Sequence, residues 1–200
     1  MDKISFDDKR DLTKATIEGR KKMTRRIVPK GLMEEAHAYA HRVHGDGHDM
    51  KDYLLEHARY KVGQIVAIAE CYRTLYRNGK LPVHNCEDLE KYIDMAGWGN
   101  KMFVKASLMP NRIRFTNVRV ERLQDITDED CLKEGIIRKT LCPPGDIDYY
   151  YVPGMPVRSK RDIFPTPRDA FATLIDKISG KGTWGNNPWV YVYEYELVRL

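Results

Sequence analysis

Apolar and polar residues alternate most regularly in two segments, 111–123 and 187–198, and both are therefore predicted to be β-strands. The alternation of the first segment slips after Phe115 and resumes at Val118 and Val120. Further strand segments are predicted at 3–6, at 25–28 with Pro29 as the end, and within the β-rich runs 60–76 and 101–110.

Helices are predicted where capping residues bound a segment or where apolar residues recur at helical spacing. The segment 164–182 has both features, since Thr166 and Pro167 suit a first turn and one face carries Phe171, Leu174, Ile175 and Ile178. Thr127 and Gly135 bound a shorter helix. Other helices are predicted at 7–19 with Gly19 as the stop, at 31–60 in two pieces broken at 44–49, and at 86–96; residues 138–162 have an irregular pattern.

Strands near both ends with helices scattered between them predict an α+β fold, in the form of a small twisted barrel closed by the terminal strand. No internal repeat is visible. A length of 200 residues with 42% hydrophobic content suffices for one well-buried core. A single domain over 1–200 is therefore predicted.

The composition of the chain indicates where in the cell the protein is expected. No apolar run approaches the ~20 residues that span a bilayer, and the first residues lack the apolar stretch of a signal peptide, so no membrane partner is predicted. The cysteines are far apart and form no C-x-x-C pair: Cys71, Cys86, Cys131 and Cys142. Such spacing predicts reduced thiols in a cytoplasmic protein.

The positive charge is concentrated at the start of the chain. The net charge is +5, and residues 1–30 carry ten Lys/Arg against five Asp/Glu, whereas the rest holds 24 of each. Five of these cations lie in GRKKMTRR, residues 19–26, around Thr24. A basic segment of this kind attracts phosphate groups, although a solvated charged surface is the simpler alternative.

Four blocks of the sequence occur in an order that resembles the ASCH domain of the PUA-like superfamily, in particular its longer phage and prophage versions. The blocks are GRKKMTRR, YKVGQIVAIAECY, LMPNRIRFTNVRVERLQDITDEDCLKEGI and GTWGNNPWVYVYEYEL. The resemblance implies a PUA-like barrel with a cleft beside the first helix, and insertions at 31–59, 77–100 and 138–162. Proteins of this fold bind RNA or modified nucleobases, and some similar small proteins are amidohydrolases that deacylate cytidine. The family's lysine, threonine and glutamate match Lys21, Thr24 and Glu134.

The chemistry of these three residues is consistent with two roles. A threonine hydroxyl becomes a nucleophile only beside a base, and the cations around Lys21 favour a lowered pKa that would let it serve. Glu134 lies in the last turn of a predicted helix, where the dipole disfavours a carboxylate unless a cation such as Lys21 approaches it. Binding without turnover requires less, namely cationic side chains and a loop of backbone N–H groups.

Several other residues are candidates for contacts with a ligand. Arg20, Arg25 and Arg26 are expected at phosphate groups, beside Gly19 of the same loop. Glu70 and Lys105 match a glutamate and a lysine of the longer ASCH proteins, and the resemblance implies that both could face the cleft. Trp184 could stack on a base. Histidines at 37, 41, 44 and 48 have a spacing that metal sites use, but they fall in a predicted insertion, so no metal or other cofactor is predicted.

The function predicted first is recognition of a nucleotide, a modified nucleobase or RNA in a basic cleft at residues 19–26. The alternative is a metal-independent amidohydrolase acting on N4-acylated cytidine or similar nucleosides through Lys21, Thr24 and Glu134. A third possibility is a phage protein-interaction module that works through the insertions. The sequence carries no prediction of the oligomeric state.

Overall fold

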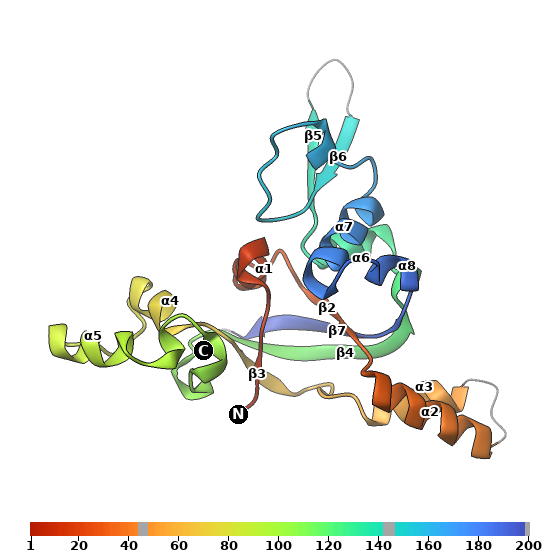
Figure 1. The fold of residues 1–200 in the computed structure, drawn as a ribbon, viewed down its shortest axis with the longest axis horizontal. Coiled ribbons are helices and arrows are strands. Elements are labelled where there is room, and N and C mark those ends of the chain that lie inside the picture. Colours follow the sequence, from red (N-terminus) through yellow and green to blue (C-terminus); the bar gives the residue numbers. More distant parts are fainter. Residues whose placement is uncertain (44–47, 142–146, 199–200) are drawn as a thin grey trace.

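A five-stranded mixed sheet forms the centre of the molecule (Figure 1). The computed structural model describes residues 1–43, 48–141 and 147–198. The strand order is β1 (Lys3–Ile4), β3 (Ile65–Ile68), β4 (Arg112–Arg122), β7 (Trp189–Val198) and β2 (Met23–Ile27). β1 runs parallel to β3 and all other neighbours are antiparallel. The predicted α+β class is confirmed.

The predicted closure of the sheet into a barrel is not found in the described residues. β1 and β2 are the two edges of the sheet, and β1 is only two residues long and pairs with β3 alone, so it offers no ladder to β2. A side chain spans the opening instead, because Arg26 Nη2 donates to the carbonyl oxygen of Ser5 at 2.5 Å. The sheet is therefore open along one seam.

A bulge in β4 accounts for the slip in its sequence pattern. The register with β7 shifts between Phe115 and Asn117, so that Phe115 lies opposite Tyr195 and Val118 opposite Tyr193. One extra residue reverses the alternation of side chains, and Phe115 and Val118 consequently share the same face of the sheet. The predicted slip is confirmed.

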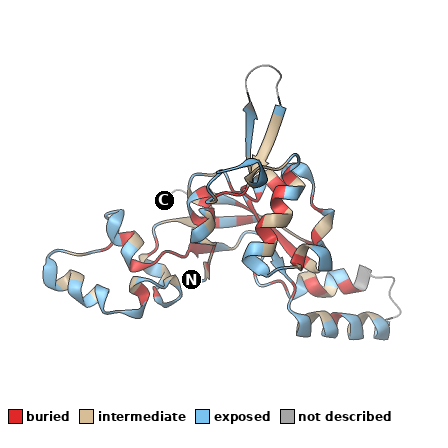
Figure 2. Ribbon diagram, turned by 45° about the horizontal axis from the view of Figure 1, so that its top comes forward, coloured by how far each residue is buried: buried red, intermediate tan, exposed pale blue. Residues whose placement is uncertain are grey.

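Aromatic residues fill the inner face of this sheet. Phe115 and Tyr193 are at most 1% exposed, and Tyr60 stacks on Phe115 with ring centroids 4.7 Å apart. The Tyr193 ring meets Tyr60 edge-on at 5.4 Å. Figure 2 shows buried residues gathered in the sheet and the helices beside it, while the outlying segments are largely exposed. Tyr191, Tyr193 and Tyr195 of the last strand are therefore part of the core.

Most predicted helices are present: α1 (Leu12–Ile17, after the 3-10 turn η1, Asp8–Arg10), α2 (Lys30–Val43), α3 (His48–Glu56), α5 (Cys86–Ile93), α6 (Asp128–Lys133) and α7 (Pro167–Ser179). Thr127 caps α6 and Thr166 caps α7 through their side chains, as predicted. The predicted buried face of α7 is wrong at one position, because Ile178 is 40% exposed near the helix end. A short helix, α8 (Thr183–Asn186), follows.

Three predicted segments take a different structure. The second half of the β-rich run 60–76 is a helix, α4 (Tyr72–Arg77), whose Tyr72 and Leu75 are buried. Residues 101–110 form 3-10 turns, η3 (Lys101–Phe103) and η4 (Ala106–Leu108), because they bury Val104 and Met109 in a second cluster rather than pairing with a strand. The segment predicted to be irregular contains an antiparallel hairpin, β5 (Ile137–Leu141) with β6 (Ile147–Tyr151).

Three parts project from the central body in Figure 1: α2 with α3, α4 with α5, and the β5–β6 hairpin. The two helix pairs lie at opposite ends of the long axis. They fall largely within the segments that the resemblance implies to be insertions, and the division into one domain with insertions stays a prediction. No helix of the described residues is long and apolar enough to cross a membrane.

Candidate functional site

A pocket of about 450 Å³ lies beside the edge strand β2. Lys21, Thr24 and Glu134 contribute its polar side, and the apolar side chains of α7, among them Phe171 and Leu174, contribute the opposite side. The segment 5–7, which follows β1, closes a third side. The structure thus brings together three residues that are 113 positions apart in the sequence at their extremes.

Lys21 is buried at this pocket and uses all of its hydrogen-bond donors. Its Nζ donates to the carbonyl oxygens of Met23 at 2.7 Å and Glu134 at 2.9 Å, and to Glu134 Oε2 at 2.6 Å. An ammonium has three N–H groups, so this cation is fully satisfied. The approach of Lys21 to Glu134, the C-cap residue of α6, was expected from the helix dipole and is present as an ion pair.

Burial lowers the pKa of the Lys21 ammonium below its ordinary value. The charge and the hydrogen bond of Glu134 oppose this shift, while the nearby charges of Arg26 and Arg25 add to it. Desolvation disfavours the charged form of an amine, which is the condition for a lysine to act as a base near neutral pH. The predicted direction of the pKa shift is therefore present.

The hydroxyl of Thr24 is available for a ligand. Thr24 lies in β2 opposite Tyr193, is 5% exposed and lines the pocket. Within the described part of the chain no group forms a hydrogen bond with this hydroxyl, and none joins it to Lys21 Nζ. A general base must lie within hydrogen-bond reach of the proton that it removes. The geometry is therefore suited to ligand binding as it stands. It is suited to catalysis only if the Thr24 hydroxyl and Lys21 Nζ move within hydrogen-bond reach of each other.

Arg25 has a structural role that the sequence does not indicate. Its Nε and Nη2 donate to Glu121 Oε1 at 3.1 and 2.6 Å, and Nη2 also donates to Asp130 at 2.9 Å. Its Nη1 donates to Glu134 Oε1 at 3.2 Å and to the Met23 sulfur at 3.2 Å. All five N–H groups of the guanidinium are taken, so Arg25 has no donor left for a phosphate.

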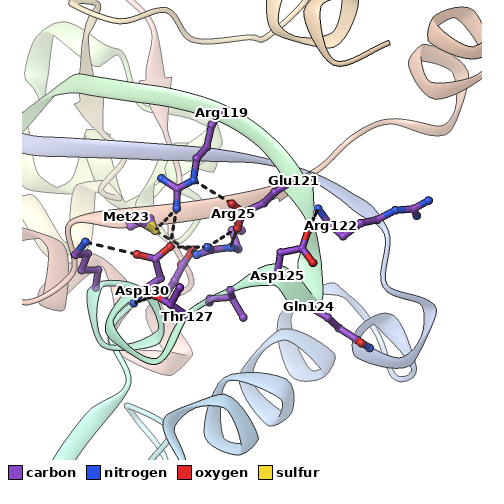
Figure 3. Close-up of polar contacts among 12 residues, drawn as sticks. Met23, Arg25, Arg119, Glu121, Arg122, Gln124, Asp125, Thr127 and Asp130 are labelled. Carbon is purple, nitrogen blue, oxygen red and sulfur yellow. Dashed lines mark hydrogen bonds and ion pairs between the residues drawn. The ribbon is translucent and has the colours of Figure 1, made fainter. Parts of the chain in front are cut away.

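Arg119 extends this network across the sheet (Figure 3). Arg25 and Arg119 lie in one row, because both pair with Val192 of the strand between them. Arg119 donates to Asp130 at 2.6 Å, to Glu121 at 3.0 Å, and to Glu194. Sequence reasoning missed Arg119, Glu121 and Asp130; their only signal was a charged residue on a strand face or in a first helical turn.

The network predicts a loss of stability in acid. Burial raises the pKa of Asp130, but the hydrogen bond and charge of Arg25, with the charges of Arg119 and Lys133, outweigh it and hold the pKa below 3.8. A depressed carboxyl pKa contributes stability above the unfolded value, and this contribution is lost as the pH falls through the folded value. We expect the free energy of unfolding to decrease as the pH is lowered from about 5 past 3.8.

Urea unfolding at a series of pH values measures this dependence, with Asp130→Asn compared to the unsubstituted protein. The variant should be less stable at neutral pH and should show a shallower decline in this window. Asp52→Asn, an exposed residue of α3 without an ion pair among the described residues, is the control. An unchanged slope in Asp130→Asn would contradict the assignment.

Arg25 and Arg26 of the basic segment also line this pocket, and Arg26 is the one of the two that carboxylates of the described residues do not hold. Its guanidinium lies 5.7 Å from the centre of the Phe6 ring. Arg20 lies outside the pocket, is exposed, and pairs with Glu18 at 2.7 Å. Gly19 has a φ of 75° and borders a smaller hollow on the other side of Lys21, with Lys22. Of the predicted phosphate-binding residues, the structure therefore places Arg25 and Arg26 at the pocket, with Arg25 occupied by carboxylates, and Arg20 and Gly19 outside it.

Three further candidates lie away from the pocket. Glu70 is buried beyond the end of β3, where burial raises its carboxyl pKa against the hydrogen bond from Asn111 at 3.0 Å. Lys105 is exposed at the start of η4. Trp184 packs edge-on against Phe171 and accepts a hydrogen bond at its carbonyl from Gln124, so it covers the core behind α7.

In the described part of the chain no three His, Cys, Asp or Glu side chains are placed to hold a metal ion. His37 and His41 lie exposed on α2. His44 and the side chain of His48 lie outside the described residues. Comparisons with family models, curated proteins and solved structures found no match for this chain.

Proposed function

We propose that the pocket beside β2 binds a nucleoside or a modified nucleobase. The observation that supports this most is the unpaired hydroxyl of Thr24 next to the buried Lys21–Glu134 pair, in a pocket of about 450 Å³. This volume falls in the range of about 300–1,000 Å³ that small-ligand sites occupy. A polar side opposite the apolar wall of α7 suits a heteroaromatic ring with a polar edge.

A ligand with one phosphate at most is proposed for this pocket, in preference to the RNA backbone that the sequence also suggested. Arg25 is engaged by carboxylates and Arg20 lies outside, which leaves Arg26 at the pocket. Binding through several phosphates makes affinity fall steeply with salt, whereas one phosphate contact gives a slope near −1. We therefore expect a weak dependence of affinity on salt.

Replacement of Thr24 by valine removes the free hydroxyl and keeps the side-chain shape. If the hydroxyl bonds the ligand, the affinity for cytidine or N4-acetylcytidine should fall about threefold to tenfold, the effect of one hydrogen bond. Isothermal titration calorimetry measures the change. Thr173→Val on α7, whose hydroxyl bonds Asp169 O within its own helix, is the matched control. Equal affinities in the two variants would count against Thr24 as a ligand contact.

Amide hydrolysis of an N4-acylated cytidine is the second candidate, and the lowered pKa of Lys21 favours it. In this reaction Lys21 would act as the unprotonated amine, the form that its lowered pKa favours. The amine would accept the Thr24 proton while the hydroxyl oxygen attacks the acyl carbon, and the resulting Lys21 ammonium would pass that proton to the leaving nitrogen of cytidine. Water would then release the acid. Glu134 would hold Lys21 in place through their 2.6 Å contact.

Release of cytidine from N4-acetylcytidine, followed by chromatography, separates the two candidates. Turnover that stops in both Thr24→Val and Lys21→Ala but persists in Thr173→Val would establish hydrolysis. Binding without release in the unsubstituted protein would leave recognition as the function. Thermal unfolding of the same preparations shows whether a variant without turnover is folded.

The site beside α1 also supports the proposal that the chain is a PUA-like protein of the ASCH type, although its sheet is open at the seam that Arg26 spans. Cys71, Cys86 and Cys131 are free thiols. They support the proposed cytoplasmic location, which stays a prediction.

A further inference from the structure

A second pocket, of about 350 Å³, lies on the other side of the seam between β1 and β2. Residues of β1, β2, the start of α2 and the segment after α3 surround it. Its walls include Tyr60, Tyr191 and Tyr193, and its lining is mainly apolar. None of the candidate residues of the first pocket takes part in it except Arg26.

Cations surround this pocket without acidic partners. Lys3, Arg26 and Arg59 line it, and in the described part of the chain no Asp or Glu side chain does. The Lys3 ammonium donates to the carbonyl oxygens of Lys101, Met102 and Val104, so Arg26 and Arg59 supply the free donors. Arg59 is exposed and lies over the Tyr60 ring at 5.3 Å, and neither Arg59 nor Arg26 forms an ion pair with a described residue. Guanidiniums with free donors bind phosphate oxygens in two-point contacts. The charge of this site is therefore complementary to a phosphate.

The wall of the pocket offers contacts for a flat ring. His57 lines it, and in the described part of the chain Tyr53 is the one aromatic ring paired with its imidazole, stacked at 4.1 Å. His57 is exposed, so the opposite face can accept another ring. Leu32 and Ile27 add apolar surface. A phosphate next to an aromatic ring is the chemistry of a nucleotide.

Arg26 connects the two pockets. Ser5, Arg26 and Ile27 line both of them, and the hydrogen bond from Arg26 Nη2 to Ser5 O forms the partition. A phosphate bound by Arg26 would thus lie at the border, with room for a nucleoside on each side. A phosphodiester has one group on each side of its phosphate, as this arrangement requires.

We propose that the second pocket binds a nucleoside monophosphate unit, with Arg26 and Arg59 at its phosphate and its base against the His57 and tyrosine wall. This inference rests on the proposed function of the first pocket. The ligand of the whole site is then a dinucleotide whose first nucleoside occupies the pocket of Thr24 and whose phosphate lies at Arg26. No covalent step is involved in this assignment.

Calorimetric titrations with cytidine, adenosine 5′-monophosphate and the dinucleotide cytidylyl-(3′→5′)-adenosine test the assignment. Arg59→Glu reverses the charge at an exposed position and is expected to weaken binding of the monophosphate and the dinucleotide about tenfold or more, while cytidine is unaffected. Thr24→Val should weaken cytidine and the dinucleotide but not the monophosphate. Arg77→Glu, an exposed arginine of α4 without an ion pair among the described residues, is the matched control for net charge.

Equal affinity for the monophosphate in Arg59→Glu and Arg77→Glu would overturn the second site. A dinucleotide that binds no more tightly than its separate parts would overturn the connection between the pockets. Binding of the monophosphate that depends on Arg59, in a protein that binds no cytidine, would support the second site and count only against the proposed function of the first. Thermal unfolding of each variant confirms that the compared proteins are folded.

Discussion

Replacement of Arg25 by leucine is expected to lower the free energy of unfolding by about 3–5 kcal/mol, the loss typical of removing one partner from a buried ion pair. The Arg25 side chain is 1% exposed, and it bonds to Glu121, Asp130 and Glu134. Without it these carboxylates repel one another in a poorly solvated place. Leucine fills much of the volume but supplies no donor. Urea unfolding at pH 7 measures the difference.

A matched control comes from the same sheet. Arg114 pairs with Glu196 at 3.4 Å, but the two side chains are 48% and 57% exposed. Solvent screens such pairs, so Arg114→Leu should cost no more than about 1 kcal/mol. Arg25→Lys should fall between the two, because it restores the charge but only three of the five donors. Similar losses for Arg25→Leu and Arg114→Leu would show that the network contributes little.

Elements of this fold were predictable where the local sequence pattern and the final environment agree. The strand at 187–198 and the helix at 164–182 each carry a complete signal, since alternation or capping residues are enough to define them. The slip in the pattern after Phe115 indicated the bulge for the same reason, because side-chain alternation is a property of the chain itself. Such features need no knowledge of distant residues.

Features that depend on distant partners could not be predicted. The cationic loop at 19–26 indicated a surface for phosphates, yet β2 turns Arg25 inward to carboxylates about 100 residues later in the chain. Alternation along β2 places Arg25 and Arg26 on opposite faces of the strand. It cannot predict which face is buried, because α6, which is distant in the sequence, covers the face of Arg25. Residues 101–110 show the same limit, since burial of Val104 and Met109 decides their structure.

Lys21 links the fold and the site, because the same ammonium both lines the pocket and bonds α6 to the loop before β2. A variant that loses ligand binding could therefore have lost its local fold instead. Thr24→Val avoids this ambiguity, since the Thr24 hydroxyl has no partner among the described residues. The role of Lys21 in stability has to be measured separately.

Substitution of Lys21 by methionine should cost about 3 kcal/mol of unfolding free energy. The substitution leaves the Glu134 carboxylate 5% exposed with Arg25 as its remaining cation, and it deprives the carbonyl oxygens of Met23 and Glu134 of a donor. Methionine matches the length of the lysine stem, so the loss comes from the missing ammonium rather than from a cavity. Urea unfolding at neutral pH measures it.

The double variant Lys21→Met with Glu134→Gln tests this cause. Glutamine removes the uncompensated charge but keeps an oxygen that can accept from Arg25 Nη1, which lies 3.2 Å from Oε1. If the charge of Glu134 is what destabilises Lys21→Met, the double variant should recover about 1 kcal/mol or more relative to it, and the two substitutions should not be additive. Additive losses would show that Lys21 stabilises the fold through its two carbonyl contacts. The ion pair would then matter more for the ligand site than for the free energy of unfolding.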